Sequence, residues 1–378
     1  MNFEEHASKP LLAEAGIAVP ERRLVRTAEE AAEACAAIGP VVVKAQVPTG
    51  KRGKAGGIRM AANADEARDA ANAILGMRIG AHTVERLLVE EQAAIASELY
   101  AAVLNDPDSK GPLLMFSAVG GMDIETIAAD RPETLRKATV DVREGFSESE
   151  ARRLLEGLDS GASSDAMASV LAALYRAYYD NDAELLEINP LAILQDGRIV
   201  ALDCKFVLDD SSIQRQQALS ARGTPDPLSE LEARAQAQGL KYIQLDGEVG
   251  VLANGAGLTM TSMDVITYLG GRAANFLEIG GEAYTKSVPA LEIVLSNPNI
   301  RSLVVNFCGA FARTDVMTEG VLDAWEKLQP SIPIFFSVHG TGAKAAREML
   351  KTRLGVEPYP DMDAAIVAAV EAAGGRPE

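Results

Sequence analysis

Cysteine, histidine and positive charge are scarce in this chain of 378 residues. Its three cysteines, Cys35, Cys204 and Cys308, fit neither a disulfide framework nor a zinc site, which favours a reducing cytoplasm. Only 36 basic residues face 54 acidic ones, and the net charge of −18 argues against non-specific binding to nucleic acid or to anionic membranes. Apolar runs stay below the roughly 18 residues of a membrane span. The acidic start at residues 1–5 lacks the apolar segment of a signal peptide.

The length and the pattern of the chain predict two domains, each with its own core. Residues 1–225 mix helical segments, beginning with one at residues 4–15, with short strands, which indicates an α+β domain. Residues 226–241 are predicted as a linker. Between residues 242 and 378, strands repeatedly run into a glycine turn and then a helix. This α/β pattern predicts a parallel sheet with sites at the carboxyl ends of its strands.

A short apolar strand at residues 41–43 ends in Lys44 and leads into a basic, glycine-rich loop at residues 48–57. A lysine that closes an apolar strand must either reach solvent or meet an anion. Exposed backbone N–H groups beside the cationic side chains of residues 51–54 suit a polyphosphate. The spacing is not that of a Walker A loop, and a mobile surface turn is an equal alternative for the loop taken alone.

Residues 184–202 predict a β-hairpin. Alternation places Glu187 and Asn189 on one face of its first strand, with Asp203 close to them at the far end of the second strand. The same alternation turns Cys204 toward the core. Two carboxylates and an amide oxygen suit Mg²⁺ beside nucleotide phosphates. From this segment alone, the polar face of an ordinary hairpin is an alternative of equal weight.

Taken in order along the chain, these motifs resemble the β subunit of succinyl-CoA synthetase, the ADP- or GDP-forming carboxylate–CoA ligase. The resemblance covers nearly the whole length and is carried by residues 1–5, 43–47, 52–57, 88–90, 98–100, 187–190, 202–205, 245–247 and 254–258. It implies an N-terminal ATP-grasp domain followed by a flavodoxin-like (Rossmann-like) CoA-ligase domain. It also implies a cytoplasmic heterodimer that acts in the tricarboxylic acid cycle.

The resemblance further implies roles for individual residues. It places the nucleotide, ATP and ADP or GTP and GDP, against Lys44, Lys51, Arg52, Gly53, Glu90, Ala93 and Glu98. It makes Asn189 and Asp203 the Mg²⁺ ligands and Glu187 the catalytic carboxylate that faces a phosphohistidine. It lines the site for the carboxylic acid and phosphate in the second domain with Asn254, Ala310, Phe311 and Ala312.

The histidine of the family's reaction is the part that this chain lacks. The family phosphorylates a histidine, which phosphorylates a bound carboxylate, and the thiol of CoA then attacks the acyl phosphate. None of His6, His82 and His339 matches that histidine, which lies in the α subunit with most of the CoA site. We therefore expect half of an enzyme, partnered by an α subunit. His339 as the nucleophile is the alternative, although a histidine in a βα turn more often packs or bonds locally.

The chain departs from the family at residues 309–313, which read Gly-Ala-Phe-Ala-Arg instead of Gly-Gly-Ile-Val-Arg. This change predicts a small acid other than succinate, so a malate–CoA ligase or another member of the family is an alternative. Lys51 leaves the choice between adenine and guanine nucleotide open. A stand-alone ATP-grasp ligase and a catalytically silent scaffold are two further alternatives. The C-terminal domain argues against the first, and Lys44, Glu187 and the two metal ligands argue against the second.

Overall fold

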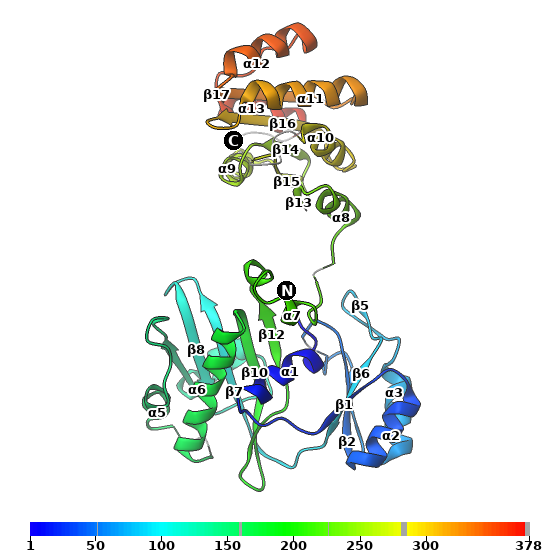
Figure 1. Cartoon of the computed structure of the whole chain (residues 1–378), viewed down its shortest axis with the longest axis vertical. Helices are drawn as coiled ribbons and strands as arrows, with labels where there is room; N and C mark the ends of the chain where they lie inside the picture. Colours follow the sequence, from blue (N-terminus) through cyan, green and yellow to red (C-terminus); the bar gives the residue numbers. More distant parts are fainter. Residues whose placement is uncertain (51, 159–160, 226, 281–285, 375–378) are drawn as a thin grey trace. The chain divides into compact units, whose positions relative to one another are not determined.

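The computed structural model describes residues 1–50, 52–158, 161–225, 227–280 and 286–374 of the chain. Lys51, one of the predicted phosphate-binding residues, lies outside the described residues. The chain divides into two compact units, Met1–Asp226 and Pro227–Glu378 (Figure 1). Within the described residues, none of the helices is both long and apolar enough to span a membrane.

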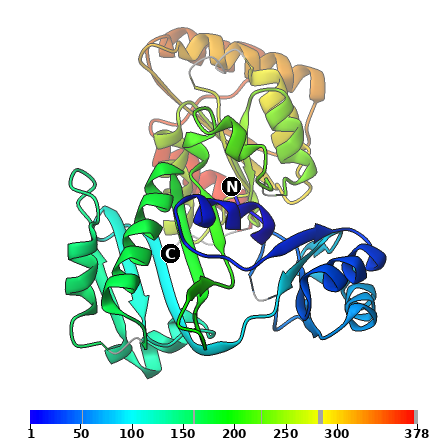
Figure 2. The same ribbon diagram turned by 60° about the horizontal axis from the view of Figure 1, so that its bottom comes forward.

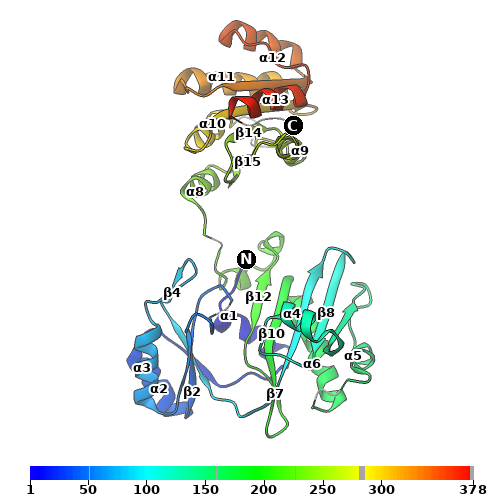
Figure 3. The ribbon, with the colours of Figure 1, turned by 180° about the vertical axis from the view of Figure 1, so that it is seen from behind.

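The smaller sheet of the first unit carries Lys44. Its strands are β1 (Arg22–Val25), β2 (Val41–Ala45), β3 (Ile58–Ala61) and β6 (Leu87–Glu91). The helices α2 (Ala28–Ile38) and α3 (Ala64–Ile74) accompany it, and a two-stranded ribbon of β4 (Arg78–Ile79) and β5 (His82–Thr83) lies between α3 and β6 in the chain. The strands are antiparallel in the order β1-β6-β2-β3, and α2 and α3 lie together on one face (Figure 3). Val41, Val43 and Ala45 of β2 are buried beneath these helices. Alternation therefore turns Lys44 to the opposite face.

The larger sheet of the first unit carries the predicted metal ligands. Its strands are β7 (Ile95–Asp106), β8 (Gly111–Ser117), β9 (Leu135–Thr139), β10 (Ala183–Leu194), β11 (Ile199–Ala201) and β12 (Lys205–Leu208). They run in the order β11-β10-β7-β8-β9, with β12 also paired to β10. The helices of this part are α1 (Glu5–Glu14), α4 (Ile124–Asp130), α5 (Glu148–Leu155), α6 (Ser164–Asp180) and α7 (Gln217–Ser220), with 3₁₀ turns at Pro132–Thr134 and Asp210–Ser212.

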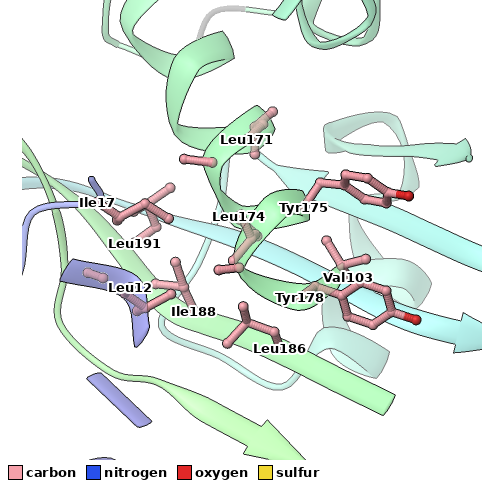
Figure 4. Packing of buried hydrophobic residues seen from close by; sticks show 14 of the residues in the cluster. Leu12, Ile17, Val103, Leu171, Leu174, Tyr175, Tyr178, Leu186, Ile188 and Leu191 are labelled. Atoms are coloured by element: carbon pink, nitrogen blue, oxygen red, sulfur yellow. The ribbon is translucent and has the colours of Figure 1, made fainter. Parts of the chain in front are cut away.

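The hydrophobic core beside the larger sheet lies between that sheet and α6. Figure 4 shows Leu174 and Tyr178 of α6 over Leu186 and Ile188 of β10, and all four side chains are buried. Leu12 of α1 enters the same cluster from the side, so the first helix of the chain is part of the core. Each such side chain contributes about 1.5–3 kcal/mol of burial free energy, which fixes α1 against the sheet.

The predicted hairpin is present, but its second strand is interrupted. Leu191 of β10 pairs with Ala201 of β11, as expected for a hairpin over residues 184–202. Pairing then stops at Ala201 and resumes at Lys205, which lies opposite Glu187. Asp203 thus lies in a break between two short strands rather than near the end of one continuous strand. The prediction for Cys204 is confirmed, since its side chain is buried in the core.

The second unit is built around one five-stranded sheet. Its strands are β13 (Lys241–Gln244), β14 (Val249–Ala253), β15 (Asn275–Glu278), β16 (Ser302–Gly309) and β17 (Ile334–Gly340). Its helices are α8 (Glu230–Ala237), α9 (Ala256–Tyr268), α10 (Ser287–Leu295), α11 (Thr314–Leu328), α12 (Ala343–Met349) and α13 (Met362–Ala372), with a π-helical turn at Leu350–Leu354. The strand order is β13-β15-β14-β16-β17, and only β13 is antiparallel to its neighbour.

Helices cover both faces of this sheet. Ile266 of α9 and Ile366 of α13 pack on one face, whereas α8, α10, α11 and α12 contribute to a separate core on the other face. The parallel α/β architecture predicted for the C-terminal part is therefore confirmed. Residues 226–241, predicted as a linker, include α8, whose Leu231 and Ala235 are buried in the second core.

Candidate nucleotide and metal site

Lys44 meets two carboxylates on the inner face of the smaller sheet. Its ammonium group donates to Glu5 Oε1 at 2.9 Å and to the carbonyl of Leu202 at 2.6 Å, and it is paired with Glu90. Burial alone would lower the pKa of Lys44, but the neighbouring carboxylates of Glu5 and Glu90 raise it above its ordinary value. Lys44 is therefore a fixed cation within a ring of acceptors.

Arg52 connects the glycine-rich loop to the larger sheet. Its guanidinium group donates to Asp203 Oδ1 at 2.7 Å and to the carbonyl of Ala45 at 3.1 Å, and it lies 2.7 Å from Glu5 Oε2. The loop is held by the Gly57 N–H, which donates to the carbonyl of Arg52 at 2.9 Å. Burial opposes the charge of Arg52, whereas Asp203 and Glu5 raise its pKa. The loop thus brings a cation directly to a predicted metal ligand.

The loop is also tied to the segment before α4. Lys54 pairs with Asp123 at 2.6 Å, and both side chains are well exposed. A pair of this kind contributes about 0–1 kcal/mol, so it orients the loop without locking it.

Asn189 and Asp203 are the predicted metal ligands, and both already have partners. The N–H of Gly121 donates to Asn189 Oδ1 at 2.9 Å, and Asn189 Nδ2 donates to the carbonyl of Met122 at 2.9 Å. Asp203 Oδ1 accepts from Arg52 and also from the N–H of Cys204 at 2.7 Å. Across the described residues, no three side chains of His, Cys, Asp and Glu gather as a metal-binding group. The donor set instead suits a metal held by one or two side-chain oxygens together with phosphates.

Glu187 is half-buried beside these ligands and opposite Lys205. Burial raises the pKa of Glu187, Lys205 opposes this shift, and the nearby charge of Asp203 adds to it. The neighbouring Tyr100 is buried as well, and burial together with Glu187 raises its pKa. By contrast, burial raises the pKa of Cys204 to about 12, so that thiol is inert core packing.

Two of the residues predicted to contact base and ribose, Ala93 and Glu98, adjoin Ala192 of β10, whereas Glu90 lies in the charge cluster around Lys44. Glu90 is buried on β6 in the charge cluster, and Ala93 packs beside Ala192 and Leu194 in a small apolar cluster. Glu98 is exposed on β7 and lies against Gly121, where an added Cβ would come within 2.0 Å of Glu98 Oε2. The segment around Gly121 therefore covers both Glu98 and Asn189.

Glu5 and Lys9 belong to the same cluster, and neither was among the predicted site residues. Lys9 donates to Leu202 at 2.9 Å and pairs with Glu5 at 2.8 Å and with Glu90. The two residues are four apart on α1, a spacing that places them on one helical face. In the sequence, the only indication of this buried cluster is a charged pair on the helix that also carries Leu11 and Leu12.

The predicted substrate residues of the second unit lie at the carboxyl edge of its sheet. Asn254 Nδ2 donates to the carbonyl of Cys308 at 2.8 Å, and the Cys308 N–H donates to Asn254 Oδ1 at 2.7 Å. Both polar atoms of Asn254 thus clamp the end of β14 to β16. Phe311 is fully exposed, so it does not face the core, whereas Ala312 packs partly against it.

His339 and its neighbours form the adjoining part of this edge. His339 lies opposite Cys308 at the end of β17, and Gly340 lies opposite Gly309. An added Cβ on Gly340 would come within 2.1 Å of the carbonyl oxygen of Gly309, so the two strand ends require glycine here. A surface hollow lined by residues 340, 342–345, 348 and 349 opens beside them.

Comparison with known proteins finds relatives over the full length. Residues 2–193 match the ATP-grasp domain family, and residues 252–363 match the CoA-ligase family. The chain is 40% identical over 377 residues to the succinate–CoA ligase [GDP-forming] subunit beta of Thermus thermophilus, covering 99% of this chain and all of that protein. It is 38% identical over 388 residues to the [ADP-forming] subunit beta of Paraburkholderia xenovorans, with complete coverage of both.

A solved structure shares the same two-part architecture. ATP citrate lyase from Methanothrix soehngenii, in complex with citrate and coenzyme A, superposes with a TM-score of 0.70 at 25% identity. The match covers 98% of this chain and 99% of that one. The ATP-grasp and CoA-ligase domains expected from the motifs are thereby confirmed.

Proposed function

The chain belongs to the family of succinate–CoA ligase β subunits, and on that basis we propose that it phosphorylates a histidine of a partner α subunit. It is a subunit of a carboxylate–CoA ligase that uses a nucleotide and CoA. The observation that carries the proposal is the meeting of Lys44, Arg52 and Asp203 within the first unit. Cations for phosphate and oxygen ligands for a metal are thus supplied side by side from separate segments.

Lys44 and Arg52 are the proposed phosphate ligands. Both are held by carboxylates, Lys44 by Glu5 and Arg52 by Glu5 and Asp203, and both would turn from them to reach a polyphosphate. Lys51 and Gly53 of the same loop complete the phosphate contacts in this proposal. Glu90, Ala93 and Glu98 are assigned to the base and ribose, along the connection between the two sheets.

Asn189 and Asp203 are the proposed ligands of Mg²⁺. An amide oxygen and a carboxylate, with phosphates supplying further oxygens, are the donors that this ion prefers. When bound, Mg²⁺ would neutralise charge on the phosphoryl group during transfer. Asn189 and Asp203 would hold the ion with side-chain oxygens that also accept from the Gly121 N–H and from Arg52. Metal binding would therefore act on the two contacts that fix the neighbouring loops.

Glu187 is the proposed catalytic carboxylate. It accepts a hydrogen bond from one N–H of the partner's imidazole and so directs the other ring nitrogen toward the phosphoryl group. The bond between the γ-phosphorus and the bridging oxygen breaks, a phosphorus–nitrogen bond forms, and the nucleoside diphosphate leaves. The phosphohistidine then phosphorylates the carboxylic acid, and the thiol of CoA displaces phosphate.

The second unit is assigned to the small carboxylic acid. Asn254, Ala310, Phe311 and Ala312 lie on its carboxyl edge, and the exposed ring of Phe311 is available to shape an acid pocket. This supports a preference for an acid other than plain succinate, with a malate–CoA ligase as one candidate. The partner α subunit supplies the phosphohistidine and most of the CoA site, and we place the pair in the cytoplasm.

The test compares the purified chain with and without a co-expressed α-like partner. The chain alone should bind ADP or GDP in the presence of Mg²⁺, which calorimetry measures, and should make no acyl-CoA. Robust acyl-CoA synthesis by the chain alone would refute the two-subunit assignment and support a stand-alone ligase. Failure of the pair to bind nucleotide at all would instead support a silent scaffold.

A further inference from the structure

Lys9 is a lysine with no exposed surface in a position that no part of the proposed reaction uses. It lies on α1, which Figure 2 shows between the two sheets of the first unit. Burying an isolated ammonium group is costly unless its donors are paired. The three donors of Lys9 meet Glu5 Oε1 at 2.8 Å, the carbonyl of Leu202 at 2.9 Å, and Glu90 Oε1. Lys9 therefore has no donor left for a ligand.

Lys44 uses the same three groups. Its ammonium contacts Glu5 Oε1, the carbonyl of Leu202, and the other oxygen of Glu90. Two lysines thus share two carboxylates and one carbonyl. With Arg52 and Asp203 included, the cluster holds three cations and three carboxylates and is electrically balanced.

The two lysines differ in what they can reach. Lys44 retains slight exposure and Lys9 has none, so only Lys44 can turn toward a bound phosphate. When Lys44 and Arg52 turn to a polyphosphate, Glu5 loses both of these partners and Glu90 loses Lys44. Two buried carboxylates without a counter-ion would oppose that movement.

We propose that Lys9 is a positioning residue that keeps Glu5 and Glu90 paired while Lys44 and Arg52 bind the nucleotide. The inference rests on the proposed function, because it takes Lys44 and Arg52 as the phosphate ligands. Without Lys9, Lys44 would be the one remaining cation of the cluster in contact with Glu90, so its departure would leave that carboxylate buried and unpaired. With Lys9 in place, the carboxylates keep a resident cation and Lys44 is released at low cost.

The test is calorimetric titration of Mg-ADP and Mg-GDP into the full chain and its variants. Lys9→Met removes the charge and keeps the length, and it should raise the Kd by about tenfold to a hundredfold, which is less than the full cost of breaking a buried ion pair because part of that cost falls on folding. Glu5→Gln should tighten binding, because it frees one donor of Lys44. The double variant Lys9→Met/Glu5→Gln should return to near the native Kd.

Leu12→Ala provides a matched control for stability. Leu12 is buried on the same helix and points into the apolar core, so its truncation lowers the melting temperature without touching the charges. It should leave the Kd unchanged. If Lys9→Met lowers only the melting temperature, as Leu12→Ala does, Lys9 is structural and the inference is wrong.

Two further outcomes keep the test decisive. Should Lys9→Met fail to fold, Glu5→Gln is compared with the double variant, where loss of Lys9 must again weaken binding, and equal Kd values overturn the inference. If the native chain binds neither nucleotide, the proposed function fails first. If the native chain binds and Lys9→Met binds equally well, only the role of Lys9 fails.

Discussion

Asp203→Asn tests the metal site, because it removes one negative charge and preserves the size of the side chain. It also weakens the contact with Arg52 at 2.7 Å. The two losses act in opposite directions on nucleotide binding. A weaker metal ligand disfavours Mg-nucleotide, whereas a released Arg52 is free for phosphate.

The relative size of these two effects decides whether nucleotide binding weakens or tightens. The Asp203 side chain is 34% exposed, so water partly screens its ion pair with the buried Arg52, and asparagine still offers Arg52 an oxygen acceptor, so the loss is about 1 kcal/mol. Loss of a charged ligand contact costs about 1.5–3 kcal/mol, the usual value for hydrogen bonds to charged groups. That range corresponds to about a 10- to 150-fold rise in Kd before the smaller effect is subtracted. Binding of Mg-nucleotide should therefore weaken.

The assay is calorimetric titration of ADP or GDP with Mg²⁺ and with a chelator. Asp203→Asn should bind nucleotide more weakly than the native chain with Mg²⁺ and equally well or better without it. Asp196→Asn is the matched control, since Asp196 pairs with Arg198 at the exposed turn of the same hairpin. An unchanged Mg²⁺ requirement in both Asp203→Asn and Asn189→Ala would show that the hairpin is only structural.

Three other substitutions give separate readouts. Restoring Gly-Ile-Val at residues 310–312 should shift relative kcat/KM values among small acids in the two-subunit enzyme by about 10-fold or more. If these ratios stay unchanged and the native enzyme prefers succinate, the turn does not determine acid selectivity. The pKa of Glu187 is raised from its ordinary 4.5, so ionising this carboxyl destabilises the folded protein, and that loss of stability is absent below pH 4.5 and appears as the pH rises. Glu187→Gln should therefore raise the melting temperature at pH 7 but not at pH 4, as a thermal melt at each pH would measure. Gly340→Ala should destabilise the second unit in urea by more than Gly355→Ala: both have positive φ, which costs about 1–2 kcal/mol, but only Gly340 would meet a carbonyl, that of Gly309. Equal losses would mean that the two strand ends adjust freely.

Local pattern predicted the elements and several of their faces. The apolar strand that closes with Lys44 predicted that this lysine either reaches solvent or meets an anion, and in the structure it meets Glu5 and Glu90. Strand alternation placed Cys204 in the core. Strand–glycine–helix repeats predicted the parallel sheet of the second unit. These features depend on neighbours within a few residues, which the sequence displays directly.

The charge cluster depends on contacts that no local pattern encodes. Arg52 and Asp203 are 151 residues apart, and Lys9 and Glu90 are 81 apart. Lys9 is buried on α1, the helix whose Leu12 packs in the core. Asn254 is a further case, because the sequence pattern around it predicts the end of a strand but does not predict its two hydrogen bonds to Cys308.

The contacts of α1 and of the residues before it also have a consequence for folding during synthesis. Phe3 stacks edge-on against Phe206 at a ring distance of 4.9 Å, and the Phe3 N–H donates to the carbonyl of Phe206. Phe3 therefore leaves the ribosome well before Phe206, the residue on which it packs. Until β12 has emerged, Glu5 and Lys9 stay in water, and nascent chains ending before Lys205 should be cleaved readily by protease in the α1 region.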